Sequence, residues 1–288
     1  MIHQKQNSST RALVLGGGGV TGIAWEVGVL TGVVEAGVAL YKADTIIGTS
    51  AGSFVGAALA SSDNLKKLFA AQFEPNDFEI PATVSERLAA AWYNAFVIGG
   101  SDPQRVGAAF GAIAKEHPAL VSVAQSRSAV EARLVTREWP QTLRVTARDA
   151  DTGQLHVFDR TSGIALIDAV SASGAVPGIS PRVSINGRAW IDAGMVSSTN
   201  AHLADDYARV VILAPLPTGY GLIPGVAEDV AAMSASATVF LVTPDAQSGA
   251  EIGPELGSNI YDPTRRSAVA LAGQAQGRSI AAAIQTMW

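Results

Sequence analysis

Residues 45–60 read TIIGTSAGSFVGAALA: a short β-branched run, a turn of small residues, and a run of small and apolar residues. Thr45–Ile47 predicts a buried strand, and Ala51–Ala60 predicts a helix. The turn between them, Gly48-Thr49-Ser50-Ala51-Gly52, has the pattern G-x-S-x-G. A serine at a sharp strand-to-helix turn is typical of a nucleophile elbow, which exposes the hydroxyl and needs small neighbours, here Gly48 and Gly52. The alternative is a serine that only caps a buried helix.

A second glycine-rich turn precedes this one. Arg11–Leu15 predicts a strand, and Gly22–Ala36 predicts a mostly apolar helix. Between them, Gly17-Gly18-Gly19-Val20-Thr21-Gly22 matches G-x-G-x-x-G, which fits a dinucleotide site, a loop whose amides bind an oxyanion, or a turn that only packs. A dinucleotide site wants an acidic side chain at the end of the second strand, but Asp44 is at its start and the Ser50 turn follows its end. The oxyanion loop, formed by Gly17, Gly18 and Gly19, is therefore favoured over the nucleotide site.

Two strand–helix pairs with apolar strands predict an α/β fold with a mainly parallel central sheet covered on both faces. Leu143–Arg148 and Gln154–Asp159 predict a hairpin, and Asn186-Gly187 is the strongest hairpin signal in the chain. Further strands are expected at Arg182–Ile185, Arg188–Ile191, Val210–Leu213 and Val239–Val242, and a further helix at Ile164–Ser173. We expect a flexible tail at residues 1–10 and a single domain over residues 11–288.

Helix starts can be proposed at three places. Thr83-Val84-Ser85-Glu86 matches a capping box, and Val84, Leu88, Trp92 and Phe96 then recur at a spacing of four. Asp102-Pro103 and Asp262-Pro263 each place a capping side chain before a first-turn proline. Ala214–Gly225 holds three prolines and is expected to form a rim loop.

Composition excludes several classes of protein. The 288 residues are 48% hydrophobic and 16% charged, carry a net charge of −5 and include no cysteine. No basic patch of the kind that binds nucleic acid is visible. The lack of cysteine removes disulfides, thiolate catalysis and Cys-based zinc sites. Ala12–Leu40 is apolar enough to suggest a membrane helix, but four consecutive glycines argue against one helix. With no signal-peptide pattern at residues 1–10, we expect a cytoplasmic protein.

A base for Ser50 has to be found among few candidates. Asp192-Ala193-Gly194 follows the strand Arg188–Ile191, where an aspartate is often only a turn residue. The four histidines are His3, His117, His156 and His202. A triad in the order serine, acid, histidine would need a late histidine, but 86 residues follow His202. The usual triad therefore fits poorly.

Together, the glycine loop Gly17–Gly22, the elbow Gly48–Gly52 and Asp192-Ala193-Gly194 resemble the patatin-like phospholipase family, in the family's order. The segment from Ser171 to Pro177 also looks like the Ser/Pro stretch that the family has ahead of its aspartate. The resemblance spans about Ala12 to His202. It implies a three-layer α/β/α fold and hydrolysis of lipid esters through a Ser50–Asp192 dyad. It also implies an oxyanion hole at Gly17–Gly19, with Gly22, Gly48, Gly52 and Gly194 as motif glycines.

The resemblance also implies that the reaction uses no cofactor, metal or histidine, and that the partner is a lipid or acyl ester met by transient contact at a membrane surface. Two residues depart from the family. Thr21 stands where the glycine loop often has Arg or Lys, and Asn200-Ala201-His202 lacks the proline of the usual Asn-x-Pro. A nucleotide-binding protein and a non-catalytic scaffold of the same fold stay open as alternatives. We further expect the helix through Trp92 and Phe96 to cover the acyl site. Headgroup, chain length and oligomeric state stay open.

Overall fold

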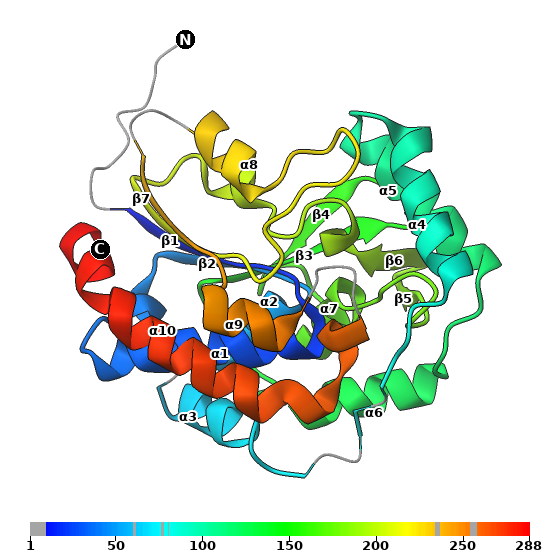
Figure 1. Ribbon diagram of the computed structural model, residues 1–288. Coiled ribbons are helices and arrows are strands. Elements are labelled where there is room, and N and C mark those ends of the chain that lie inside the picture. Colours follow the sequence, from blue (N-terminus) through cyan, green and yellow to red (C-terminus); the bar gives the residue numbers. More distant parts are fainter. Residues whose placement is uncertain (1–9, 60–61, 76–77, 80, 234–236, 254–257) are drawn as a thin grey trace.

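The computed structural model describes residues 10–59, 62–75, 78–79, 81–233, 237–253 and 258–288. The tail expected at residues 1–10 lies, apart from Thr10, outside the described residues. Within them the chain forms one mixed sheet with helices on both faces (Figure 1).

The sheet has the order β5-β6-β3-β2-β1-β7-β8, with β4 paired to β3. Neighbouring strands from β3 through β2, β1 and β7 to β8 run parallel, whereas β4, β5 and β6 join by antiparallel pairing. The strand bounds are β1 (Arg11–Leu15), β2 (Thr45–Thr49), β3 (Leu143–Asp149), β4 (Leu155–Phe158), β5 (Val183–Ile185), β6 (Arg188–Asp192), β7 (Arg209–Leu213) and β8 (Thr238–Val242). The mainly parallel sheet is thus confirmed.

Helices complete three layers because the central strands are apolar on both faces. One face is covered by α1, α2, α7 and α10, whose core includes Leu13 and Leu15, and the other by α8, whose core includes Ala12 and Val14. The bounds are α1 (Gly19–Glu35), α2 (Ala51–Ala58), α3 (Ser62–Ala70), α4 (Glu86–Gly99), α5 (Pro103–Glu116), α6 (Val123–Arg133), α7 (Leu166–Ser173), α8 (Val226–Ala232), α9 (Ala246–Ile252) and α10 (Arg266–Met287).

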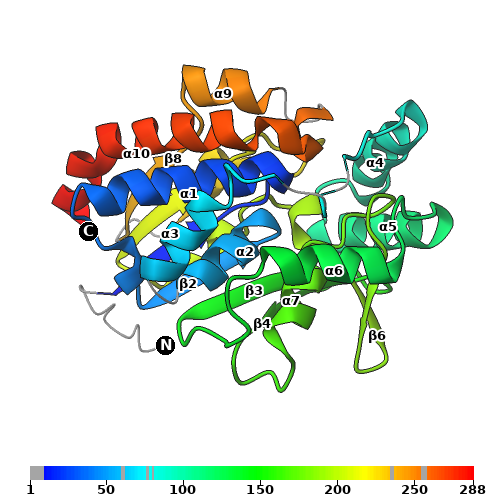
Figure 2. The ribbon, with the colours of Figure 1, turned by 90° about the horizontal axis from the view of Figure 1, so that it is seen from below.

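The first and last of these helices are in backbone contact. Figures 1 and 2 both show α10 lying along α1. A Cβ on Gly28 or Gly32 of α1 would stand 2.3 or 2.2 Å from a backbone oxygen of α10, and one on Gly273 or Gly277 would stand 2.5 or 2.2 Å from one of α1. Only glycine allows this approach. The four glycines, in two Gly-x-x-x-Gly pairs, therefore join the helices.

The predicted hairpins and helix starts can now be checked. β3–β4 and β5–β6 are antiparallel pairs, and Asn186 and Gly187 have the positive φ angles of 51° and 77° that their turn needs. Asp102 caps α5 as predicted. The capping box at Thr83 is wrong: Ser85 is the N-cap and accepts from the Leu88 amide, so the helix begins two residues later than predicted. Likewise α1 begins at Gly19 rather than Gly22.

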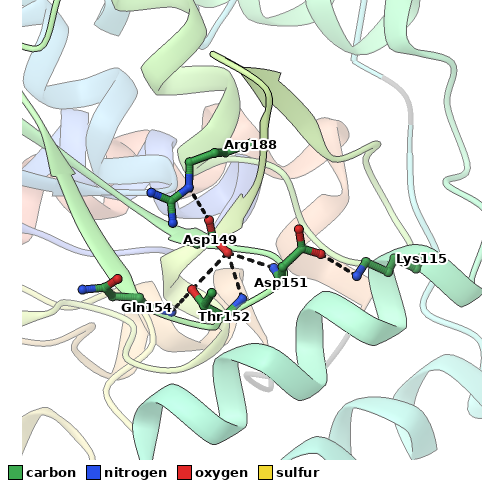
Figure 3. Close-up of polar contacts among 6 residues, drawn as sticks. All are labelled: Lys115, Asp149, Asp151, Thr152, Gln154 and Arg188. Carbon is green, nitrogen blue, oxygen red and sulfur yellow. Dashed lines mark hydrogen bonds and ion pairs between the residues drawn. The ribbon is translucent and has the colours of Figure 1, made fainter.

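A buried carboxylate fixes the strand that leads to Asp192. Figure 3 shows Asp149, at the end of β3, accepting hydrogen bonds from the Asp151 and Thr152 amides at 3.0 and 2.8 Å. Arg188 of β6 donates its Nε to the other carboxylate oxygen at 2.8 Å. Burial raises the pKa of Asp149, but the hydrogen bonds from Thr152, Arg188 and Asp151 outweigh it and lower the pKa. The β3 turn and β6 are thereby held together.

Candidate active site

Ser50 lies at the turn between β2 and α2. Its φ and ψ are 52° and −116°, a strained combination for a residue with a side chain, and it is the N-cap residue of α2. A Cβ on Gly52 would stand 2.2 Å from the Leu15 carbonyl oxygen, and one on Gly48 would stand 2.7 Å from that of Gly52. The two motif glycines therefore let α2 begin directly against the sheet. This is the geometry of a nucleophile elbow.

The glycine loop runs beside the elbow. A Cβ on Gly17 would lie 3.3 Å from the Cβ of Ser50, and the Gly52 amide donates to the Gly16 carbonyl at 2.9 Å. The Gly17 amide itself donates to the Ser198 carbonyl at 2.7 Å, so it is already occupied. Gly18 and Gly19 stand at the start of α1, and within the described chain their amides have no recorded acceptor. Of the three predicted glycines, only Gly18 and Gly19 therefore keep an amide without a recorded acceptor in the described chain.

Asp192 ends β6, opposite Ala147 of β3. Its carboxylate accepts from the Gly194 amide at 2.7 Å, and its residue surface is only 3% exposed. Burial raises the pKa of Asp192 to about 7, and the nearby Ser50 hydroxyl and the Gly194 amide offset part of that rise. Ser50 and Asp192 line one small pocket, so the structure brings the two side chains together and shifts the pKa of the carboxyl towards neutral pH.

Glu26 also supports the glycine loop, a role that was not foreseen. This fully buried side chain of α1 accepts from the Gly16 amide at 2.8 Å, and its second oxygen has no recorded partner among the described residues. Burial raises the pKa of Glu26 well above its usual range, more than the Gly16 hydrogen bond lowers it. The signal in the sequence was an acid flanked by apolar residues, Trp25 and Val27, in the middle of one helix.

A cavity of about 110 Å³ opens beside Ser50. A smaller pocket that Ser50 also lines includes Asp192, Gly18 and Leu216, the last from the predicted rim loop. Tyr261 and Val176 line both. Ser173 of α7 supports the elbow from behind, because its hydroxyl accepts from the Ser50 amide at 2.8 Å.

The histidines do not join this site. No histidine lines either cavity at Ser50, as far as the chain is described. His117 is the C-cap of α5, and His156 packs against Phe158 and Trp190. His202 lies near Asp229 of α8, where it opposes the rise that burial causes in the pKa of Asp229. His3 lies outside the described residues.

The expectation that α4 covers the acyl site is wrong. Trp92 is buried and donates its indole N–H to the Pro177 carbonyl at 3.0 Å, but no α4 residue lines the cavity at Ser50. The helix packs behind the cavity wall, in one cluster with Val176 and Ile179. Asp44, weighed earlier as a nucleotide ligand, accepts from the Arg11 amide at 2.7 Å, at the end of the sheet away from Ser50.

Comparisons with known proteins give one family match. The family model described as patatin-like phospholipase matches residues 13–205. No curated protein matches the chain. Among solved structures, one titled "Crystal structure of type III effector protein ExoU (exoU)" is 16% identical, with a TM-score of 0.42 over 96% of this chain. The chain spans about half, 53%, of the length of that structure.

Two further features are absent from the described residues. No helix found there has both the length and the apolar character needed to span a membrane. No group of three or more His, Asp or Glu side chains in that part of the chain is arranged to hold a metal ion.

Proposed function

Because this chain belongs to the patatin-like phospholipase family, we propose that it is a lipid acyl hydrolase that cleaves carboxylic esters with Ser50 as nucleophile and Asp192 as base. The observation that carries the proposal is that Ser50 and the buried carboxylate of Asp192 line one small pocket together with Gly18 and Gly19, with the pKa of that carboxyl raised to about 7. A carboxylate with an ordinary pKa of about 3.9 would be a poor base at neutral pH.

Each step can be assigned to a residue. Asp192 takes the proton of the Ser50 hydroxyl as Oγ attacks the ester carbonyl. The amides of Gly18 and Gly19, with the start of α1 behind them, stabilise the negative charge that develops on the carbonyl oxygen. Asp192 then gives its proton to the departing alcohol. Water, deprotonated by Asp192, attacks the acyl-enzyme, and Ser50 leaves with the proton restored.

The dyad is tested by comparing variants on a series of acyl esters. Ser50→Ala should abolish hydrolysis without unfolding the chain, since alanine fits the elbow. Asp192→Asn should lose a factor of about 10²–10⁴, because an amide cannot accept the proton. His117→Ala, His156→Ala and His202→Ala are the matched controls and should stay within a small factor of wild type.

A histidine variant as inactive as Asp192→Asn, yet folded by circular dichroism, would replace the dyad with a Ser–His–Asp triad. Failure of Ser50 to react with a serine-directed phosphonate would favour the non-catalytic scaffold. Because the chain itself supplies nucleophile, base and oxyanion donors, we also expect full activity in excess chelator. Activity lost in chelator and restored by a metal would overturn this mechanism.

A further inference from the structure

The cavity beside Ser50 has apolar and polar walls. Its apolar side chains come mainly from α1, α2, α6 and the segment after α7: Val20, Ile23, Phe54, Val130, Val176 and Ile179. Glu79 and Arg133 line the same cavity, but they also line a second one that does not include Ser50. The charged pair, like Val20, Ile23 and Phe78, therefore lies between the two cavities.

Glu79 and Arg133 form a bidentate ion pair. The Nε atom of Arg133 donates to one carboxylate oxygen of Glu79 at 2.6 Å, and Nη2 donates to the other oxygen. The guanidinium carbon also lies 5.3 Å from the ring centre of Phe54, over its face. The Glu79 side chain is only 5% exposed. Two hydrogen bonds and the Phe54 ring hold the Arg133 guanidinium in place, so the ion pair forms a fixed, polar part of the cavity wall.

Beyond the pair lies a second cavity whose walls are mixed. Leu68, Phe78 and Val135 line it together with Gln72 and the buried Arg266, whose Nη2 donates to the carbonyls of Ala71 and Glu74. The Nε atom of Arg266 has no recorded partner among the described residues. An acyl chain that extended from the first cavity into the second would therefore have to disturb the hydrogen bonds of the Glu79–Arg133 pair between them.

We propose that the Glu79–Arg133 pair is the floor of the acyl-binding cavity and restricts this hydrolase to esters of short and medium-chain acids. The proposal rests on the proposed function. Up to the floor, each buried methylene should raise kcat/KM about fourfold. A longer chain has to open the ion pair, and breaking a buried pair is strongly unfavourable. The chain-length profile should therefore peak and then fall.

The test is a series of saturated p-nitrophenyl esters, from acetate to palmitate, assayed on wild type and on the double variant Glu79→Met/Arg133→Met. Two linear apolar side chains of similar length remove both charges without leaving one of them unpaired. The matched control is Arg127→Met/Asp168→Met, which removes a 2.7 Å ion pair between the same helix, α6, and α7. The control pair does not line the cavity. Circular dichroism verifies the fold of each variant.

In wild type we expect a maximum at an intermediate chain length. In the double variant the maximum should move by at least two carbons, so that the ratio of kcat/KM for palmitate to that for the best wild-type ester rises by more than about tenfold. The control variant should keep the wild-type profile. Wild-type hydrolysis of palmitate at the maximal rate, or a profile unchanged in the double variant, would refute the floor.

Binding separates this inference from the proposed function. Calorimetry with free fatty acids on Ser50→Ala should show the same chain-length limit, and the limit should move in Ser50→Ala combined with both Met substitutions. If no ester were hydrolysed, the proposed function would fail and these affinities alone would decide. Affinity that rises steadily to palmitate in Ser50→Ala, or a limit unchanged in the combined variant, would overturn the floor.

Discussion

Acidification should switch off ester hydrolysis over a range that Asp192 sets. Burial raises the pKa of this carboxyl to about 7 against the opposing effects of the Ser50 hydroxyl and the Gly194 amide. Only the ionised form accepts the Ser50 proton. Hence kcat/KM should fall tenfold per pH unit below the pKa, to about a tenth of its plateau at about pH 6 and about a hundredth at about pH 5.

The assay is kcat/KM for a soluble short-chain ester between about pH 5 and about pH 9, with circular dichroism at each point. Asp192 itself does not unfold the protein in acid. A carboxyl with a raised pKa in the folded state contributes stability that is fully present below its unfolded pKa, and this stability is lost as the pH rises through about 7. Loss of activity without loss of ellipticity is therefore the expected acid response.

A histidine base would give a similar acid limb, so temperature provides the control. Ionisation of a carboxyl absorbs little heat, whereas ionisation of an imidazolium absorbs much more, and only the latter shifts strongly on warming. The midpoint should therefore stay almost fixed with temperature, and the residual activity of Asp192→Asn should lose the limb altogether. A midpoint below about pH 5, or one that moves strongly on warming, would refute Asp192 as the base.

Three further results are expected. Gly52→Ala should abolish activity and lower the melting temperature, because its Cβ would stand 2.2 Å from the Leu15 carbonyl oxygen; a normal melting curve with normal activity would contradict this. Asp149→Asn should cost about 2 kcal/mol of unfolding free energy at neutral pH, since its side chain is buried and bonded to Arg188. Because the pKa of Asp149 is lowered, that loss should shrink as the pH falls through the acid range, and a loss that stays constant in chemical denaturation would count against it. Trp92→Ala should destabilise the fold by about 3–5 kcal/mol and reduce hydrolysis of long and short esters alike, and a loss confined to long esters would return α4 to the acyl site.

Local sequence signals predicted those parts of the fold that depend on neighbouring residues. Asn186-Gly187 fixes its hairpin through two positive φ angles. The turn at Ser50 could be predicted from the small residues between a strand and a helix. The helix α6 was missed because it is polar with little amphipathic pattern, although Ser122-x-x-Gln125 forms a capping box that its sequence displays.

Contacts between segments that are distant in the chain could not be predicted from the sequence. The Gly17 amide is occupied by the Ser198 carbonyl, and this pairing depends on how β1 and the segment after β6 meet in space. The same holds for Glu79 and Arg133, which are 54 residues apart. Ser50 and Asp192 could be proposed from the sequence because each comes at the end of a recognisable strand, whereas Glu26 was not singled out, since the sequence shows it only as an acid in an apolar stretch.

The glycine contact between α1 and α10 bears on when the site can fold during synthesis of the chain. The proposed oxyanion donors Gly18 and Gly19 stand at the start of α1, and the partner that α1 touches through Gly28 and Gly32 is made of residues 266–287. A ribosome-bound chain that has emerged only as far as residue 205 holds the proposed nucleophile, the proposed base and the glycine loop, yet leaves that face of α1 bare. Cotranslational folding of the site should therefore wait for α10, and the nascent chain should stay inactive towards lipid until that helix docks.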